Sequence, residues 1–162
     1  MKILAIDPGY GRCGVAILER VNNKDILLHS DCIETSSKDE FPSRLATIMR
    51  ECEILFDDHS PEEVILEKLF FKTNQKTAMH VAEVRGAIIA AAAMRNIPIH
   101  EYTPPQIKSA IAGWGGADKK QIITMVRMLL PITKTIKHDD EYDAIAVGLT
   151  HLAISKHTLR SR

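Results

Sequence analysis

Four carboxylates stand at places where apolar segments of the chain begin or end. Asp7 follows the apolar residues 3–6, and Glu67 follows the apolar residues 64–66. Asp140 and Asp143 lie three positions apart at an expected helix start, so their side chains share one face. Each alone has an ordinary reading, because an Asp at a strand end often bonds its own turn and one at a helix start often caps the helix.

Taken together, the four acids predict a metal centre. Like charges a few ångströms apart resist ionisation unless cations neutralise them. Carboxylate oxygens favour magnesium, which keeps positions open for water and phosphate, and two ions about 4 Å apart stabilise the attacking and leaving oxygens of a phosphodiester cleavage. Asp139 is an alternative ligand because it lies four positions before Asp143. His138 is either a proton shuttle or a solvated residue before the helix.

Motifs of several other classes are missing from the sequence. There is no H-E-x-x-H pair for zinc hydrolysis, no G-x-S-x-G and no Walker loop. The D-x-G after the first strand also opens the actin-like sugar-kinase fold, but the second D-x-G and the long two-lobed chain of those proteins are lacking.

Cys13, Cys32 and Cys52 show no C-x-x-C spacing, which favours reduced thiols. The longest uncharged apolar stretch, residues 87–94, is far below the ~20 residues of a membrane span, so we expect a cytoplasmic protein.

The distribution of charge favours an anionic partner, although the net charge is zero. Residues 1–67 carry 7 Lys and Arg against 14 Asp and Glu, and residues 68–162 carry 14 against 7. Four of those last seven acids lie within residues 139–143, so the rest of the second half is strongly basic. Residues 68–77, K-L-F-F-K-T-N-Q-K-T, place two aromatic residues among three lysines, a pattern typical of a loop that stacks on unpaired bases and binds phosphates.

The elements that must position these residues follow from apolar periodicity and turn signals. Strands are expected at residues 1–7, 13–19 and 26–35, then a helix from about residue 42, and a strand at 64–67. A helix at 76–95, a strand at 97–102, and helices at 104–110, 118–130 and about 139–151 follow. Three antiparallel strands followed by alternating strands and helices predict an α/β fold with a mixed sheet and helices on both faces. We expect one domain over residues 1–155 and a short basic tail at 156–162.

Residues 87–94, A-I-I-A-A-A-A-M, are apolar around the whole of their expected helix. If one face packs on the sheet, another apolar face needs cover, and small alanines would let a second copy of the helix approach closely. This predicts either a homodimer interface with Ala91 pointing outward, or a helix buried within one subunit.

Several motifs resemble the bacterial RuvC family of Holliday junction resolvases. They are I-D-P-G at 6–9, L-E-K-L-F at 66–70 and D-E-Y-D-A-I-A at 140–146. Between them R-G at 85–86, E-Y at 101–102, Q-I-K at 106–108 and A-D-K-K-Q at 117–121 match the same family in the same order. The similarity covers roughly residues 1–155.

The resemblance implies an RNase H-like fold with a five-stranded sheet, and a homodimeric, magnesium-dependent endodeoxyribonuclease that cuts four-way DNA junctions during recombination and repair. It implies two Mg²⁺ ions per active site, for which Mn²⁺ can substitute, held by Asp7, Glu67, Asp140 and Asp143. It also implies a partner complex of branch-migration helicase (RuvA-RuvB type). The DNA-binding residues are expected to be Phe70 for base stacking, Lys108 and Lys119 near the scissile phosphate, and Lys72, Lys76, Arg85 and Lys120 as further phosphate contacts. The alternatives are another RNase H-like nuclease with a different nucleic-acid substrate, or a homologue that binds junctions without cutting them.

Overall fold

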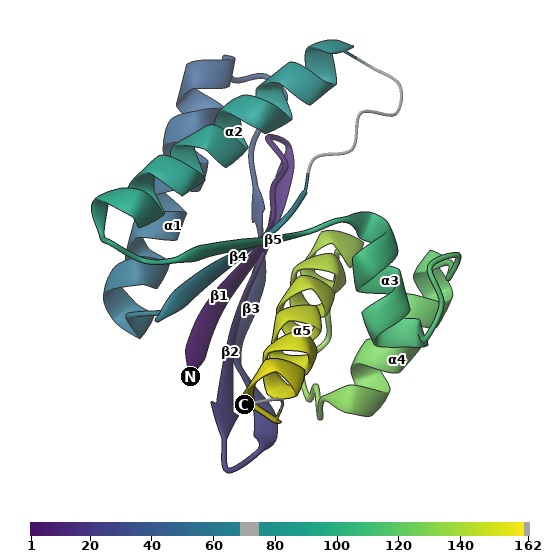
Figure 1. Ribbon diagram of the computed structural model, residues 1–162. Coiled ribbons are helices and arrows are strands. Elements are labelled where there is room, and N and C mark those ends of the chain that lie inside the picture. Colours follow the sequence, from purple (N-terminus) through teal and green to yellow (C-terminus); the bar gives the residue numbers. More distant parts are fainter. Residues whose placement is uncertain (69–74, 161–162) are drawn as a thin grey trace.

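A five-stranded mixed sheet lies at the centre of the computed structural model (Figure 1). The structure describes residues 1–68 and 75–160, and the side chains of residues 1–68 and 77–155. The strands are β1 (Lys2–Asp7), β2 (Arg12–Val21), β3 (Lys24–Glu34), β4 (Glu63–Glu67) and β5 (Ile99–Tyr102), in the order β3-β2-β1-β4-β5. β1, β2 and β3 pair antiparallel, whereas β4 is parallel to both β1 and β5. The predicted mixed sheet, with three antiparallel strands first, is confirmed.

Helices cover both faces of the sheet, as predicted (Figure 1). α1 (Phe41–His59) and α2 (Gln75–Met94) lie on one face, and α3 (Pro104–Ala112), α4 (Lys119–Leu129) and α5 (Asp139–Arg160) lie on the other. Successive side chains of a strand point to opposite faces. On β1, Leu4 and Ile6 therefore join the core beneath α1 and α2, whereas Ile3 and Ala5 join the core beneath α5. All four are fully buried, so β1 is apolar on both sides until it reaches Asp7.

Local turn and capping signals explain where several elements begin. Asn22 and Asn23 have φ of 51° and 62°, the left-handed conformation that a two-residue hairpin turn between β2 and β3 requires. α3 and α4 each begin with a capping box, in which Thr103 pairs with Gln106 and Asp118 pairs with Gln121. These caps fix the start of the two helices that carry Lys108 and Lys119.

Two expectations about helices are corrected. α5 continues to Arg160, well beyond the expected end near His151, because no Gly or Pro follows Gly148 to stop it. Ala91 does not point outward: it is only 7% exposed and packs with the core beneath α1 and α2. Ala90 and Ala93 are the exposed alanines of this stretch.

The three cysteines are free and buried. In the described part of the chain, no helix combines the length and the apolar character needed to cross a membrane.

Candidate active site

The four predicted carboxylates lie at one edge of the sheet. β1 and β4 are parallel neighbours, with Ile6 opposite Leu66, so Asp7 and Glu67 leave the sheet side by side. α5 begins next to them with Asp140 and Asp143 in its first turns. The negative charges of the other three carboxylates all act on Asp7, so Asp7 lies at the centre of the four groups.

Gly14 allows α5 to approach this closely. It lies opposite Asp7 in the β1–β2 ladder. A Cβ atom at Gly14 would stand 1.9 Å from the backbone oxygen of Asp140 and 2.6 Å from its carbonyl carbon. The missing side chain therefore lets the first turn of α5 rest against β2, beside the end of β1.

The site resists full ionisation. Burial, and then the charges of Glu67, Asp143 and Asp140, raise the pKa of Asp7 well above its usual range. Burial, and then the charge of Asp143, raise the pKa of Glu67 to about 7. Burial also raises the pKa of Asp143, although Lys119 acts in the opposite direction. A cluster with these shifts gains stability from any bound cation.

Two basic side chains of the protein partly neutralise the cluster. Lys119 pairs with Asp143, and its Nζ lies 3.0 Å from Oδ2 of Asp139. Arg12 places its Nε 3.1 Å from Oδ2 of Asp140. Sequence reasoning missed Arg12, because a lone arginine at the start of a strand carries no motif. Its signal is positional: it begins the strand whose Gly14 faces Asp7.

The structure distinguishes Asp140 from Asp139. The charge of Asp140 is among the largest causes of the raised pKa of Asp7. The hydrogen bond from Lys119 lowers the pKa of Asp139, whose side chain is half exposed. Oδ2 of Asp140 is buried and, apart from its ion pair with Nε of Arg12, has no hydrogen-bond partner among the described residues. Asp140 is thus the better placed of the two to bind a cation.

His138 belongs to a polar chain that leads to the site. Its Nε2 lies 2.9 Å from Oε1 of Glu34, and its Nδ1 lies 3.3 Å from Nη1 of Arg12. Arg12 in turn contacts Asp140. The His138 side chain is 17% exposed, so it is a packed, partnered residue rather than a solvated one. These contacts orient the Arg12 side chain. His138 is thus connected to the carboxylates through Arg12.

A cavity of about 230 Å³ opens beside the carboxylates. Two acids, Glu67 and Asp143, and two lysines, Lys108 and Lys119, line it together. Pro104, Ile107, Ile122 and Ala146 complete the wall. The cavity therefore offers acidic oxygens for a cation and ammonium groups for a phosphate on the same small surface. Because every acidic donor is a carboxylate oxygen, the set fits a hard divalent cation of the magnesium type.

The other predicted DNA-binding residues are spread more widely. Lys120 lines a separate cavity of about 320 Å³ together with Trp114, whose side chain is largely exposed. Arg85 forms an ion pair with Glu101 of β5, so its charge already has a partner.

Three further candidates cannot be placed by their side chains. Phe70 and Lys72 lie outside the described residues, and Lys76 lies in α2 with its side chain outside them. Their contact with DNA stays a prediction.

Comparison with known proteins places the chain among similar sequences and folds. The family described as Crossover junction endodeoxyribonuclease RuvC matches residues 3–151. A protein of that name from Petrotoga mobilis is 44% identical over 151 residues, which cover 93% of each chain. Another from Finegoldia magna is 42% identical over 156 residues, covering 96% of this chain and 95% of its own. The structure of T. thermophilus RuvC in complex with Holliday junction substrate aligns with a TM-score of 0.89 at 30% identity, over 98% of this chain and 96% of that one.

Proposed function

The chain belongs to the RuvC family of crossover junction endodeoxyribonucleases, and we propose that it resolves four-way DNA junctions by hydrolysing one phosphodiester bond in each of two strands. One observation carries this proposal above the others. Four carboxylates meet beside a cavity that two lysines also line, and the pKa values of three of them, Asp7, Glu67 and Asp143, are raised. This combination suits a cation and a phosphodiester bound next to each other.

Asp7, Glu67, Asp140 and Asp143 are proposed to hold two Mg²⁺ ions, for which Mn²⁺ substitutes. When bound, such ions stabilise the attacking and leaving oxygens of the phosphodiester. Asp7 is the most rigidly held of the four carboxylates, because it ends strand β1, whose residues 3–6 are fully buried. The other three carboxylates approach it from β4 and α5.

Lys119 is proposed to have two roles, as the counter-ion of Asp143 and as a phosphate contact. In the protein alone its ammonium group is the counter-ion of Asp143. Once cations neutralise the carboxylates, that ammonium group becomes available to a phosphate oxygen in the cavity. Lys108 lines the same cavity and supplies a second positive charge. The two lysines would thereby bind and orient the scissile phosphate.

The remaining DNA contacts are proposed to extend from this cavity. Lys72, Lys76, Arg85 and Lys120 would bind neighbouring phosphates, and Phe70 would stack on a base at the junction. Arg85 must exchange its contact with Glu101 for a phosphate to do so. In a cell with a branch-migration helicase of the RuvA-RuvB type, we expect the protein to work with it in the cytoplasm.

Paired incision calls for two active sites on one junction, and we infer a two-fold homodimer. α2 supports this by an exposed stripe of small and apolar residues: Met79, Ala82, Gly86, Ala90 and Ala93. A Cβ atom at Gly86 would meet nothing within 4 Å, so the stripe is open along its middle. Two α2 helices could therefore approach closely along it.

A charge on this stripe tests the dimer. Ala90→Glu should sediment as a folded monomer, and it should relax a supercoiled cruciform plasmid without linearising it in one binding event. The control Ala153→Glu changes an exposed alanine of α5 and should remain a dimer that linearises the plasmid. If Ala90→Glu stays dimeric and linearises the plasmid, the interface lies elsewhere.

The function itself is tested with three labelled substrates: a four-way junction, a linear duplex and an RNA–DNA hybrid. We expect efficient cutting of the junction alone, in magnesium but not in calcium or chelator, because the larger and looser calcium sphere misplaces the reacting oxygens. Preferential cutting of the hybrid would favour another RNase H-like nuclease. Tight junction binding without cutting in any metal would favour a non-cleaving homologue.

A further inference from the structure

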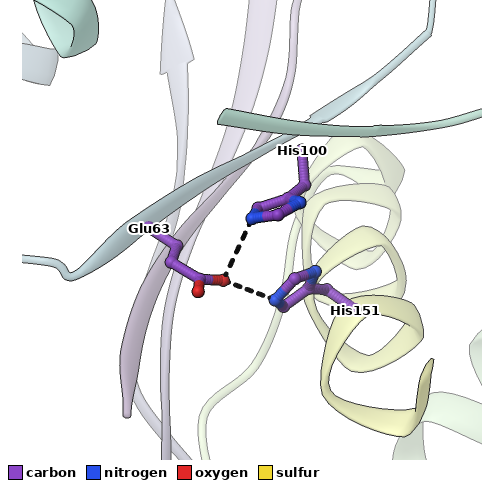
Figure 2. A group of neighbouring side chains, drawn as sticks. All are labelled: Glu63, His100 and His151. Atoms are coloured by element: carbon purple, nitrogen blue, oxygen red, sulfur yellow. Dashed lines mark ion pairs between the residues drawn. The ribbon is translucent and has the colours of Figure 1, made fainter. Parts of the chain in front are cut away.

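Glu63, His100 and His151 form a second cluster of candidate metal ligands (Figure 2). Glu63 begins β4, whose last residue is Glu67, so about 13 Å of strand separates the two. His151 follows Asp143 by eight residues of α5, or about 12 Å of helix. His100 comes from the edge strand β5. The cluster is thus distinct from the proposed active site.

The three ligand atoms lie close enough to share one ion. They all fall within 4.8 Å of one another. Nε2 of His100 is 3.5 Å from Oε2 of Glu63, and Nε2 of His151 is 2.6 Å from the same oxygen. Two ligands bound tetrahedrally to zinc lie about 3.3 Å apart. The first separation therefore fits already, and the second needs to widen by about 0.7 Å, which a small rotation of the Glu63 side chain provides.

Glu63 and His151 form a short ion pair whose two facing atoms lack good hydrogen-bond geometry. Both Oε2 of Glu63 and Nε2 of His151 are buried, and neither makes a hydrogen bond to any described residue. His151 is only 4% exposed. A buried imidazole nitrogen and a carboxylate oxygen that are paired in this way, outside hydrogen-bond geometry, are groups that a cation between them would satisfy.

Tyr102 holds the imidazole of His151 in the orientation that a ligand needs. Its hydroxyl lies 2.9 Å from Nδ1 of His151, the ring nitrogen that does not face Glu63. If Nδ1–H donates to the tyrosine oxygen, Nε2 carries the free lone pair. Burial also lowers the pKa of His151, which favours the neutral ring. A neutral histidine oriented by a partner on its other nitrogen is the form that binds metal ions.

We propose that Glu63, His100 and His151 bind one Zn²⁺ ion, with a fourth position open to solvent. Imidazole nitrogen distinguishes this site from the carboxylate site, because zinc accepts nitrogen ligands that magnesium does not favour. The His100 side chain is 43% exposed, so the site has a route for entry and room for water. The ion would link β4, β5 and α5. Of these, β4 also carries Glu67, and α5 carries Asp140 and Asp143.

The test measures metal content rather than cleavage, so its result is independent of the proposed nuclease function. The full-length protein is stripped with chelator, placed in excess Mg²⁺ to occupy the carboxylate site, and titrated with Zn²⁺. Calorimetry should give one Zn²⁺ per chain. Co²⁺ in place of Zn²⁺ should give the strong visible absorption of low-coordinate cobalt with nitrogen ligands.

Matched variants locate the ion. His100→Ala changes a half-exposed side chain and should weaken Zn²⁺ binding at least tenfold in a folded protein; Glu63→Gln should do the same. His29→Ala removes a histidine outside the cluster, and Asp143→Asn alters the carboxylate site; both should keep full Zn²⁺ binding. Zn²⁺ should also raise the melting temperature of the wild type but not that of His100→Ala. No Zn²⁺ binding by the wild type, equal binding by His100→Ala, or loss of binding in Asp143→Asn would each overturn the proposal.

Discussion

The two ends of β4 and α5 present different donor sets from the same pair of elements. At one end, Glu67 and the aspartates of the first turns of α5 supply only carboxylate oxygens. At the other end, Glu63 meets two imidazoles. The first end is crowded with negative charge that Lys119 and Arg12 partly offset. The second end balances one carboxylate with two rings that can be neutral.

This difference explains why one scaffold can keep two cations apart. A hard ion with oxygen ligands suits the carboxylate end, whereas an ion that accepts nitrogen suits the histidine end. The strand and the helix are regular elements, so about two turns of α5, from Asp143 to His151, set the distance between the two sites. The following predictions test how far the two ends are chemically separate.

The largest expected effect comes from removing a carboxylate ligand. Asp7→Asn, Glu67→Gln, Asp140→Asn and Asp143→Asn should each lower the rate of junction cleavage by about a thousandfold or more, because metal ligation supplies several kcal/mol of transition-state stabilisation. Junction binding should change little, since phosphate contacts provide most of it. Rates and gel-shift affinities measure both effects. Asp58→Asn, an exposed residue of α1, is the control. A variant of the four with wild-type rate would not be a ligand.

Variants of two glycines distinguish two effects of α5 packing: its approach to the active site, at Gly14, and its contribution to stability elsewhere, at Gly148. Gly14→Ala forces a Cβ atom into the backbone of Asp140, so it should reduce both cleavage and stability, the latter by about 1–3 kcal/mol. At Gly148 a Cβ atom would meet side-chain atoms of Leu18 and Ala5 at 2.5 and 3.0 Å. Gly148→Ala should therefore cost stability while the folded fraction cleaves normally. Denaturant unfolding measures the stability of both variants, and the cleavage rate is then expressed per folded molecule. If both variants lose cleavage equally, the two glycines do not have these separate effects.

The two ends should respond to pH in opposite directions when metal is removed. The folded-state pKa of Glu67 is raised to about 7, so its contribution to stability is complete below its ordinary pKa and is lost as pH rises through about 7. The pKa of His151 is lowered, so its contribution is present at neutral pH and is lost as pH falls through the lowered value.

Denaturant unfolding in the presence of chelator measures how much Glu67 contributes to the pH dependence of stability. Between pH 5 and pH 8 the wild type should lose about 1–3 kcal/mol more stability than Glu67→Gln does. The comparison with the variant cancels the contribution of His151, which both proteins share. Parallel stability curves for the two proteins would show that Glu67 titrates normally.

The smallest expected effect concerns Arg12. Its Nε lies 3.1 Å from Asp140, and its side chain is 48% exposed. Because an exposed ion pair contributes at most about 1 kcal/mol, Arg12→Gln should lower the Mg²⁺ concentration for half-maximal cleavage by about two- to threefold. The maximal rate should stay the same, and Arg50→Gln on α1 serves as the control. An increased Mg²⁺ requirement would mean that Arg12 helps to assemble the site rather than competing with the ion.

Much of the fold could be predicted from the sequence because its signals are local. Alternation and apolar runs located the strands, and Pro104 and the capping residue Asp118 marked the starts of α3 and α4. Element ends were less certain, as the long continuation of α5 shows. Ala91 was placed on the wrong face because a segment that is apolar all round carries no signal for which side faces the core.

The carboxylate end was within reach of sequence reasoning, whereas the histidine end was not. Acids that directly follow apolar runs stand out, and the parallel pairing of β1 with β4 then brings two of them together. Glu63, His100 and His151 are separated by dozens of residues, and each resembles an ordinary surface or core residue by itself. Only the order of β4 and β5 in the sheet, with α5 across them, reveals that they meet.

The central place of β1 has a consequence for how the active site is lost on unfolding. β1 is paired on both sides, by β2 and β4, and its residues 3–6 are fully buried. Amide protons in such a strand exchange with solvent mainly through global unfolding, whereas those of a four-residue edge strand such as β5 exchange through smaller local openings. The backbone that holds Asp7 should therefore be among the slowest to exchange deuterium. Fluctuations that release β5 would leave the anchor of the carboxylate cluster in place.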